Sequence, residues 1–227
     1  MADSPSSPIR KKMPTAEYSP TPGCIILVIG GVAILTLIIW FVYAGLKQAR
    51  EIKTFTDDKA SIVVLPKPTP EQLKEIRTRL AAYAKAIEES KPADLSLSKE
   101  DLNLLIAGDE TLESIRSNVA IKQIGEVVTA AVSFPLNGIG EKRYLNGEME
   151  FTPVVKPSSG LAVDTKSISV PGKTVSEGFV NLYREMNFLD DMLLKAFREH
   201  PVLGAPLKKT TSVTLEGGSV VLHFAPK

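Results

Sequence analysis

The residues that could do acid–base or metal chemistry in this chain are few and widely spread. Glu148 and Glu150 stand two residues apart in an alternating stretch, so on a strand their carboxylates share one face and could chelate a cation. No further carboxylate or histidine joins them nearby in the sequence, and the same alternation fits a solvated sheet face. We therefore predict no metal site and no cofactor.

The histidines and an adjacent pair of aspartates do not form a catalytic set either. His200 ends a helical pattern, where an imidazolium would suit the helix dipole, and we expect it to cap the helix. His223 falls in an alternating stretch, on the face that we expect to be solvated. Asp190 and Asp191 are neighbours, so on a helix their side chains point about 100° apart and make no carboxylate pair.

Motifs of the common enzyme classes are absent from the sequence. There is no G-x-S-x-G, no H-E-x-x-H and no P-loop, and GIGEKR at 138–143 fits a loop between strands better than a phosphate-binding loop. The only cysteine, Cys24, excludes a disulfide framework and a thiol-based metal site. The net charge of +1 gives no electrostatic case for nucleic acid. A membrane-bound hydrolase or glycan-processing enzyme is kept as the alternative to a noncatalytic protein.

The clearest signal is the apolar segment 23–46, GCIILVIGGVAILTLIIWFVYAGL. No charged side chain occurs from Cys24 to Leu46, and these residues extend about 34 Å as a helix, enough to cross a hydrocarbon core of ~30 Å. Aromatic residues near its C-terminal end suit the headgroup region. We predict a single transmembrane helix, with anchoring residues Ile25, Leu35, Trp40 and Tyr43.

A cleaved secretory signal is the alternative interpretation of this segment, because Val42 and Ala44 suit the small-residue preference before a cleavage site. The apolar run is longer than the ~7–15 residues of a signal core, and a long leader precedes it, which favours a retained anchor. Basic residues on the two sides of the span nearly balance. Because a large domain without cysteine loses nothing in an oxidising compartment, we predict the N-terminus in the cytoplasm and the C-terminal domain outside.

The chain is expected to have four parts. Residues 1–22 are rich in Ser and Pro without apolar periodicity, which predicts a disordered cytoplasmic tail before the span at 23–46. Residues 47–68 are expected to prolong the helix and then to form a stiff spacer at LPKPTP. Residues 69–227 are expected to form an extracytoplasmic α+β domain.

Local patterns predict the elements of that domain. Helical periodicity starts at Thr69, and a second helix has Ser98 as N-cap, with Asp101 at the third position and Gly108 just past its end. From about Asn118 the pattern alternates, which predicts strands at EVVTAAVSFPL, RYLNGEMEF and GLAVDTKSISV, the last with a bulge near 165–167.

A long helix and a hairpin complete the expected domain. The helix runs from a capping box at Thr174 and Glu177 to His200, and its wide apolar stripe would cover a sheet. The hairpin turns at Gly217 and Gly218. The fold class is therefore α+β, with an antiparallel sheet covered on one face by helices.

The order of elements resembles the YpmS-like family and related bitopic bacterial envelope proteins. The resemblance is carried by LSLSKEDLNLLIAG, RYLNGEMEF, GLAVDTKSISVPGKTVSEGFVNLY and VTLEGGSVVLHF, and it covers roughly residues 65–225. It implies a similar topology and a domain outside the membrane. It supplies no catalytic residues.

We predict a noncatalytic, single-pass protein of the cell envelope that is anchored in the lipid bilayer and binds a protein partner or an apolar ligand such as a lipid. A sheet covered by helices could part to admit an acyl chain, although the same apolar residues could simply fill a core. The candidate ligand face consists of Phe134, Met149, Phe179, Tyr183 and Met186.

Overall fold

A computed structural model describes residues 21–137, 142–156, 160–185 and 195–226. The contacts divide the chain into two compact units, Met1–Lys47 and Gln48–Lys227. The leader predicted to be disordered, apart from its last two residues, lies outside the described residues. The second unit begins at Gln48 and contains the predicted domain, residues 69–227.

The first helix, α1, runs without a break over Thr21–Phe55. Its portion Ile25–Phe55 is long and apolar enough to be a candidate membrane span. The predicted anchoring residues Ile25, Leu35, Trp40 and Tyr43 are all exposed on it. The predicted prolongation of the helix beyond Leu46 is confirmed.

The second unit is an α+β domain, as predicted. Its helices are α2 (Pro70–Glu88), α3 (Lys99–Gly108), the short 3₁₀ helix η1 (Glu110–Leu112), α4 (Glu113–Arg116), α5 (Glu177–Glu185), α6 (Lys195–Glu199) and α7 (Gly204–Lys209). Its strands are β1 (Ala93–Ser98), β2 (Val119–Ile124), β3 (Val128–Asn137), β4 (Lys142–Lys156), β5 (Gly160–Ser169), β6 (Ser212–Glu216) and β7 (Ser219–Phe224).

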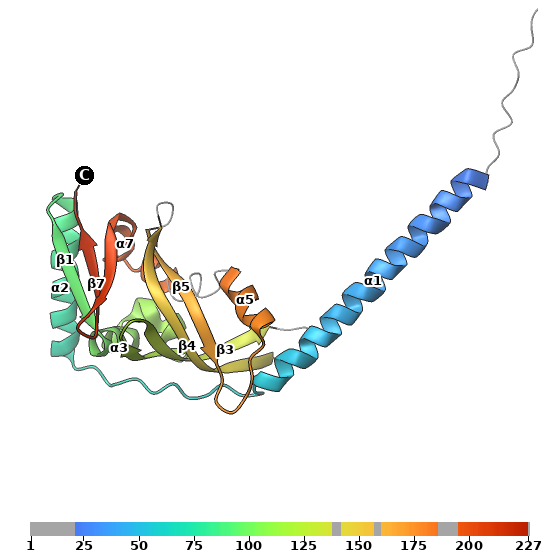
Figure 1. Ribbon diagram of the computed structural model, residues 1–227. Helices are drawn as coiled ribbons and strands as arrows, with labels where there is room; N and C mark the ends of the chain where they lie inside the picture. The colour runs from blue at the N-terminus through green and yellow to red at the C-terminus, as the bar shows by residue number, and fades with distance from the viewer. Residues whose placement is uncertain (1–20, 138–141, 157–159, 186–194, 227) are drawn as a thin grey trace, which may run out of the picture. The chain divides into compact units, whose positions relative to one another are not determined.

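The strands form two antiparallel sheets rather than the one sheet that the sequence predicted. A four-stranded meander has the order β2-β3-β4-β5, and a three-stranded sheet has the order β1-β7-β6 (Figure 1). The difference comes from β1, which the sequence pattern merged into the approach to α3. Because β1 pairs with β7, the C-terminal hairpin belongs to a separate sheet.

Local sequence signals within the strands are confirmed. The alternating residues Val128, Ala130, Val132 and Phe134 of β3 are all buried. The bulge in β5 lies at Lys166, because Glu150 pairs with Ser167 while Phe151 pairs with Thr165. Gly217 and Gly218 turn the last hairpin with positive φ angles of 56° and 75°, a backbone shape that glycine adopts without strain.

The helix starts of α2 and α3 follow the sequence, but the end of α3 does not. Thr69 and Ser98 are N-caps, and both make reciprocal capping-box bonds with the third helical residue. Gly108 is the last residue of the helix rather than the residue beyond its end. It is small because a Cβ there would lie 2.6 Å from Cδ1 of Leu73 on α2, so close helix packing explains it.

The predicted long helix also differs at its start. The Ser176 side chain, not that of Thr174, accepts the hydrogen bond from the Phe179 backbone N–H at 3.2 Å, and α5 begins at Glu177. The middle of the predicted helix, residues 186–194, lies outside the described residues. Its far end is the short helix α6.

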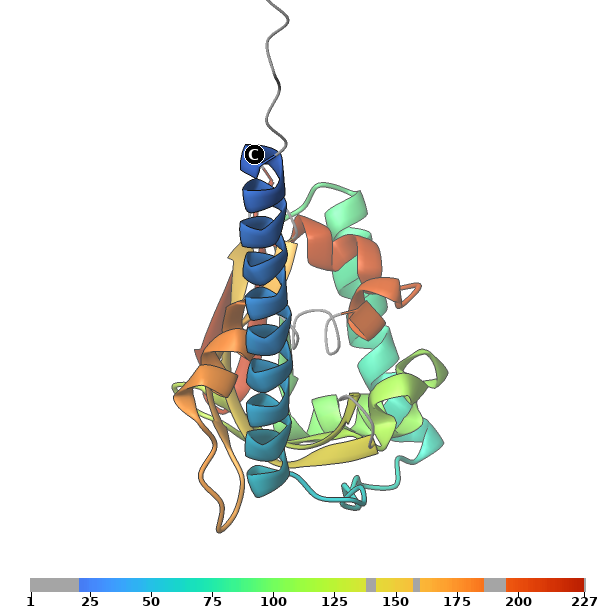
Figure 2. The same ribbon diagram turned by 90° about the vertical axis from the view of Figure 1, so that its right-hand side faces the viewer.

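The helices lie against different parts of the two sheets. α2 contacts β1, α3 contacts β1 and β2, and α7 contacts both β5 and α2. Figure 2 shows α2 and α7 on the same side of the domain. The sequence prediction of helices over one face of a single sheet is therefore replaced by helices that pack at several edges of two sheets.

We predict that Gly147→Ala lowers the free energy of unfolding by about 1–3 kcal/mol, as overpacking does. A Cβ at Gly147 would lie 2.2 Å from the Ser169 carbonyl oxygen, and that oxygen cannot move without disturbing the β4–β5 ladder. Urea denaturation of the full chain in detergent, followed by circular dichroism, measures the change. The control is Gly125→Ala, where the nearest atom would be 3.8 Å away. Equal effects of the two variants would contradict the packing argument.

Candidate functional site

An apolar cavity of about 110 Å³ lies in the space between the two sheets. Its described walls come from β1–β5 and β7 together with α3, α6 and α7, and all of the described lining residues are apolar. We call it the apolar cavity. Residues that represent its different walls are Leu97, Ile106, Val119, Ala162, Leu207 and Leu222.

The size and lining of the apolar cavity determine what it can bind. Side chains around a void lose dispersion contacts on that side, so an apolar occupant would restore them. Engineered apolar cavities of about 150 Å³ stay dry and bind benzene. A segment of hydrocarbon chain therefore suits this site, whereas its described lining offers no acid, base or nucleophile for a reaction.

The predicted ligand face does not coincide with this cavity. Phe134, Met149 and Phe179 are buried, yet none of the three is among the residues that line it. Phe179 packs edge-on against Phe55, with ring centroids 4.6 Å apart. The Tyr183 side chain and Met186 lie outside the described part of the structure. The sequence missed the cavity because its walls come from elements that only the tertiary fold brings together.

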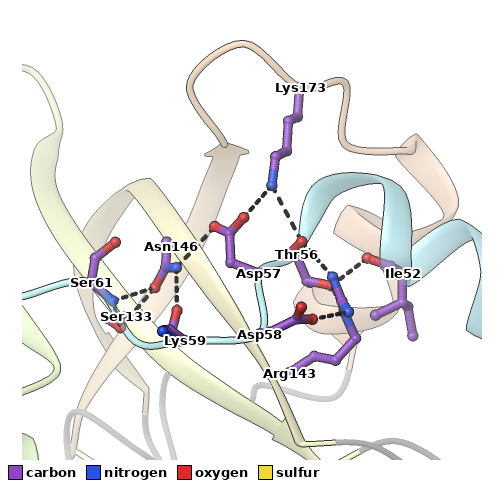
Figure 3. A network of polar contacts seen from close by, with 10 residues as sticks. All are labelled: Ile52, Thr56, Asp57, Asp58, Lys59, Ser61, Ser133, Arg143, Asn146 and Lys173. Atoms are coloured by element: carbon purple, nitrogen blue, oxygen red, sulfur yellow. Dashed lines mark hydrogen bonds and ion pairs between the residues drawn. The ribbon is translucent and has the colours of Figure 1, made fainter.

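A polar network fixes the chain that follows α1 onto the four-stranded sheet (Figure 3). The Asp57 N–H donates to the Tyr144 carbonyl at 2.9 Å, and the Tyr144 N–H donates to the Asp57 carbonyl at 2.8 Å. The Asp57 carboxylate accepts from Lys173 at 2.6 Å and from Asn146 at 2.9 Å. The hydrogen bond from Lys173 is the main cause that holds the pKa of Asp57 below its usual value.

Arg143 of β4 completes this network. Its Nε donates to the Thr56 hydroxyl and its Nη2 to the Thr56 carbonyl, both at 2.7 Å, while Nη1 pairs with Asp58. Further along, the Ser61 N–H donates to the Asn146 side chain at 2.9 Å. Residues 56–61, which lie in the predicted region of juxtamembrane helix and linker (47–68), are thus bound to the sheet by directional contacts.

The next residues cross the outer face of the same sheet and expose two aliphatic side chains. Ile62 and Val64 are 90% and 82% exposed. A groove of about 380 Å³ lies between residues 61–64 and the sheet, with Ala131, Lys122 and Glu148 among its lining. This mixed lining differs from that of the apolar cavity.

A second polar cluster is buried at the end of α6. The His200 and Asp109 side chains are only 5% and 7% exposed, and Nε2 of the histidine lies 3.3 Å from Oδ2 of the aspartate. Arg77 approaches the same oxygen at 3.3 Å, and the Thr111 hydroxyl donates to the other oxygen at 2.7 Å. Burial raises the pKa of Asp109, but hydrogen bonds from Thr111 and His200 outweigh it, so the pKa lies below the usual value.

His200 therefore has a different role from the predicted cap of a preceding helix. Its Nδ1 accepts hydrogen bonds from the backbone N–H groups of Val202 and Leu203, both at 3.2 Å, and so caps the turn that follows. Both ring nitrogens are occupied by these contacts and by Asp109. These contacts give His200 a structural role. Neither of its ring nitrogens is left to act as a base.

His223 makes a more suggestive arrangement on the three-stranded sheet. Its Nδ1 lies 2.7 Å from Asp94 Oδ1, and its Nε2 lies 3.0 Å from the Thr214 hydroxyl. A carboxylate, an imidazole and a hydroxyl in line are the parts that a hydrolase would need. Neither the apolar cavity nor the outer groove includes any of the three residues, so no described pocket holds a substrate against Thr214.

Glu148 and Glu150 are engaged with separate partners. Glu148 pairs with Lys122 of β2, and Glu150 accepts a hydrogen bond from Ser167 at 2.7 Å. Within the described residues, no group of three or more His, Cys, Asp or Glu residues is placed to hold a metal ion. The two carboxylates are accounted for by contacts between neighbouring strands.

Comparisons with known proteins leave this geometry as the basis for any functional conclusion. No protein-family model, no curated protein and no solved structure matches the chain. The resemblance to the YpmS-like family stays a prediction.

We predict that Arg143→Met raises hydrogen exchange at the Asp57 and Ser61 amides about tenfold, because hydrogen bonds to a charged group contribute roughly 1.5–3 kcal/mol. The change removes three donors to Thr56 and Asp58. Exchange followed by mass spectrometry on the full chain in lipid nanodiscs measures it. Lys142→Met is the control, since it removes a charge from an exposed neighbour on the same strand. Similar exchange in both variants would mean that the network does not fix the segment.

Proposed function

We propose that this protein is a noncatalytic, membrane-anchored protein of the cell envelope whose domain binds an acyl chain in the apolar cavity. The observation that carries the proposal is the cavity itself, a void between two sheets with only apolar residues in its described lining. An acyl chain fits this lining because it needs contact area and no polar partner.

The candidate span supports the choice of ligand. An N-terminal helix long and apolar enough to cross a bilayer would hold the domain beside a large reservoir of acyl chains. Tethering raises the effective concentration of such a ligand without any new contact. A weak apolar site of modest volume can then be occupied.

We further propose that α1 is retained as an anchor, with the N-terminus in the cytoplasm and the domain outside. The support comes from the length of the apolar run and from a domain that contains no cysteine. Because the basic residues on the two sides of α1 nearly balance, the positive-inside rule favours neither orientation. The proposed orientation therefore rests on the composition of the domain.

A protein partner is the second candidate, and the exposed pair Ile62 and Val64 favours it. Two large aliphatic side chains on this extended, uncharged segment expose apolar surface to water. Covering that surface with a partner would be favourable. A partner would be expected to bind through this segment and not through the apolar cavity. The two candidates therefore predict different regions of contact.

The orientation predicts which cysteine a membrane-impermeant maleimide reaches. In a Cys24→Ser background, a cysteine at exposed Lys91 should be labelled in intact cells, and one at Ser4 should be labelled only after permeabilisation. The mass of the purified chain is measured in parallel. Labelling at Ser4 alone would reverse the orientation, and a mature chain that starts near residue 45 would show that the segment is a cleaved signal.

The ligand proposal predicts that a photoactivatable fatty acid labels residues of the cavity wall. The full chain in nanodiscs is irradiated with a diazirine-bearing palmitic acid, and labelled peptides are located by mass spectrometry. Ala162→Leu places extra atoms in the cavity and should lower labelling of β5 and α7 about tenfold, since the site can no longer hold the chain.

The matched control is Ala84→Leu on α2, which adds the same atoms at a residue that does not line the cavity. It should leave labelling unchanged. Labelling confined to α1, or insensitive to Ala162→Leu, would refute the acyl-chain proposal. Labelling concentrated at residues 61–65 would instead favour the exposed segment as the binding surface.

A further inference from the structure

We infer that the apolar cavity holds only the methyl end of an acyl chain, about four or five carbon atoms of it, while the polar end stays outside the domain. The inference rests on the proposed function, because it concerns how an acyl chain would lie in that site. It adds which end of the ligand enters, how much of it enters and where. The ligand class is an acyl lipid with an unsubstituted methyl end.

The volume of the cavity limits how much of a chain it takes. At about 110 Å³ the cavity is smaller than the engineered cavities of about 150 Å³ that bind benzene, a molecule of six carbon atoms. In proportion, there is room for roughly four or five carbon atoms. A palmitoyl chain has sixteen carbon atoms, so most of its length would stay outside.

The chemistry of the lining determines which end enters. All of the described lining residues are apolar, and polar groups beside them already have partners. The Asn103 side chain, next to Leu102, donates to the Ile121 carbonyl and accepts from the Ile121 N–H, both at 2.8 Å. The Leu161 carbonyl accepts from Arg198 at 2.9 Å. A carboxylate buried here would lack a hydrogen-bond partner, which is costly, whereas a methyl end needs none.

The exposure of the lining residues distinguishes the inner part of the cavity from its outer part. Val119 and Ala162 are fully buried, so they mark the inner part. Among the described lining residues, those that are partly exposed are Leu102, Phe197 and Val220. A chain that enters from outside would pass one of these residues before it reaches Val119 or Ala162.

Two of the partly exposed residues lie at the same end of the cavity, which we assign as its entrance. Ser98, the N-cap of α3, pairs with Ser219, the first residue of β7 (Figure 1). Leu102 follows Ser98 by one helical turn, and Val220 follows Ser219 directly. The neighbouring turn at 217–218 is exposed, so a polar end at this entrance would remain in water.

The test varies the position of a photoreactive group along the ligand. The full chain in nanodiscs is irradiated with palmitic acids that carry an aliphatic diazirine on carbon 3, 10 or 15, and labelled residues are located by mass spectrometry. The carbon 15 probe should label Val119 and Ala162 about tenfold more than the carbon 3 probe, because carbon 3 lies beside the carboxylate that stays outside. The carbon 10 probe should label Leu102 or Val220 at the entrance.

The variant Phe197→Leu tests the limit on length. It removes three carbon atoms from the cavity wall, so more of the chain should fit, and the carbon 10 probe should label Ala162 about tenfold more than in the wild-type chain. The matched control is Phe224→Leu, the same change at a partly buried residue that packs on the core but does not line the cavity. It should leave the labelling pattern unchanged.

The possible outcomes separate this inference from the proposed function. Labelling of Val119 and Ala162 by the carbon 3 probe as strongly as by the carbon 15 probe would overturn the orientation. Equal labelling of Ala162 by the carbon 10 probe in the wild-type chain and in Phe197→Leu would overturn the limit on length. If no probe labels the cavity wall, the proposed function itself fails. The wild-type chain alone decides the orientation, so a loss of stability in Phe197→Leu would not affect that result.

Discussion

The central physical feature of this structure is an apolar space that residues of two antiparallel sheets line and do not fill. The four-stranded meander and the three-stranded sheet each turn apolar residues inward, such as Val119 from one and Leu222 from the other. Protein interiors are normally packed to the density of organic crystals, so an apolar void forfeits dispersion energy that filling would recover. Under the acyl-chain proposal this void is where the ligand binds, and α6 and α7 form part of its wall.

A second constraint concerns how the domain begins. Phe55, the last residue of α1, is fully buried, and the contacts of Thr56 and Asp57 with Arg143 and Lys173 follow directly. Surface ion pairs alone contribute little, but here they accompany backbone pairing and a buried aromatic contact. The chain leaving α1 is thereby held along β4 rather than free to swing.

Sequence reasoning predicted the features that depend on neighbours in the chain. The alternation that buries Val128 and Phe134, the cap at Ser98 and the bulge at Lys166 each need only a few adjacent residues. Sequence reasoning failed where contacts between residues far apart in the sequence determine the structure. β1 becomes a strand because β7 pairs with it, and Arg143 meets Thr56 across 87 positions of sequence. Gly108 was predicted to follow the end of a helix, but a larger residue there would collide with Leu73. A glycine that ends a helix and a glycine that allows close packing look the same in the sequence.

The candidate site illustrates why function was harder to predict than fold. Catalytic sites need particular atoms at particular spacings, so they leave motifs that a single sequence can display. An acyl-chain site needs only volume and apolar surface, and Val, Leu and Phe supply these just as they supply a core. A packed core and an acyl-chain site differ in whether the side chains of opposite walls touch. No local sequence pattern records that difference. Near the cavity wall the structure also buries a polar pair, the Asp109 carboxylate and the His200 ring, which lie 3.3 Å apart although polar groups are costly to bury. The two residues are far apart in the sequence, so the sequence does not reveal the pair.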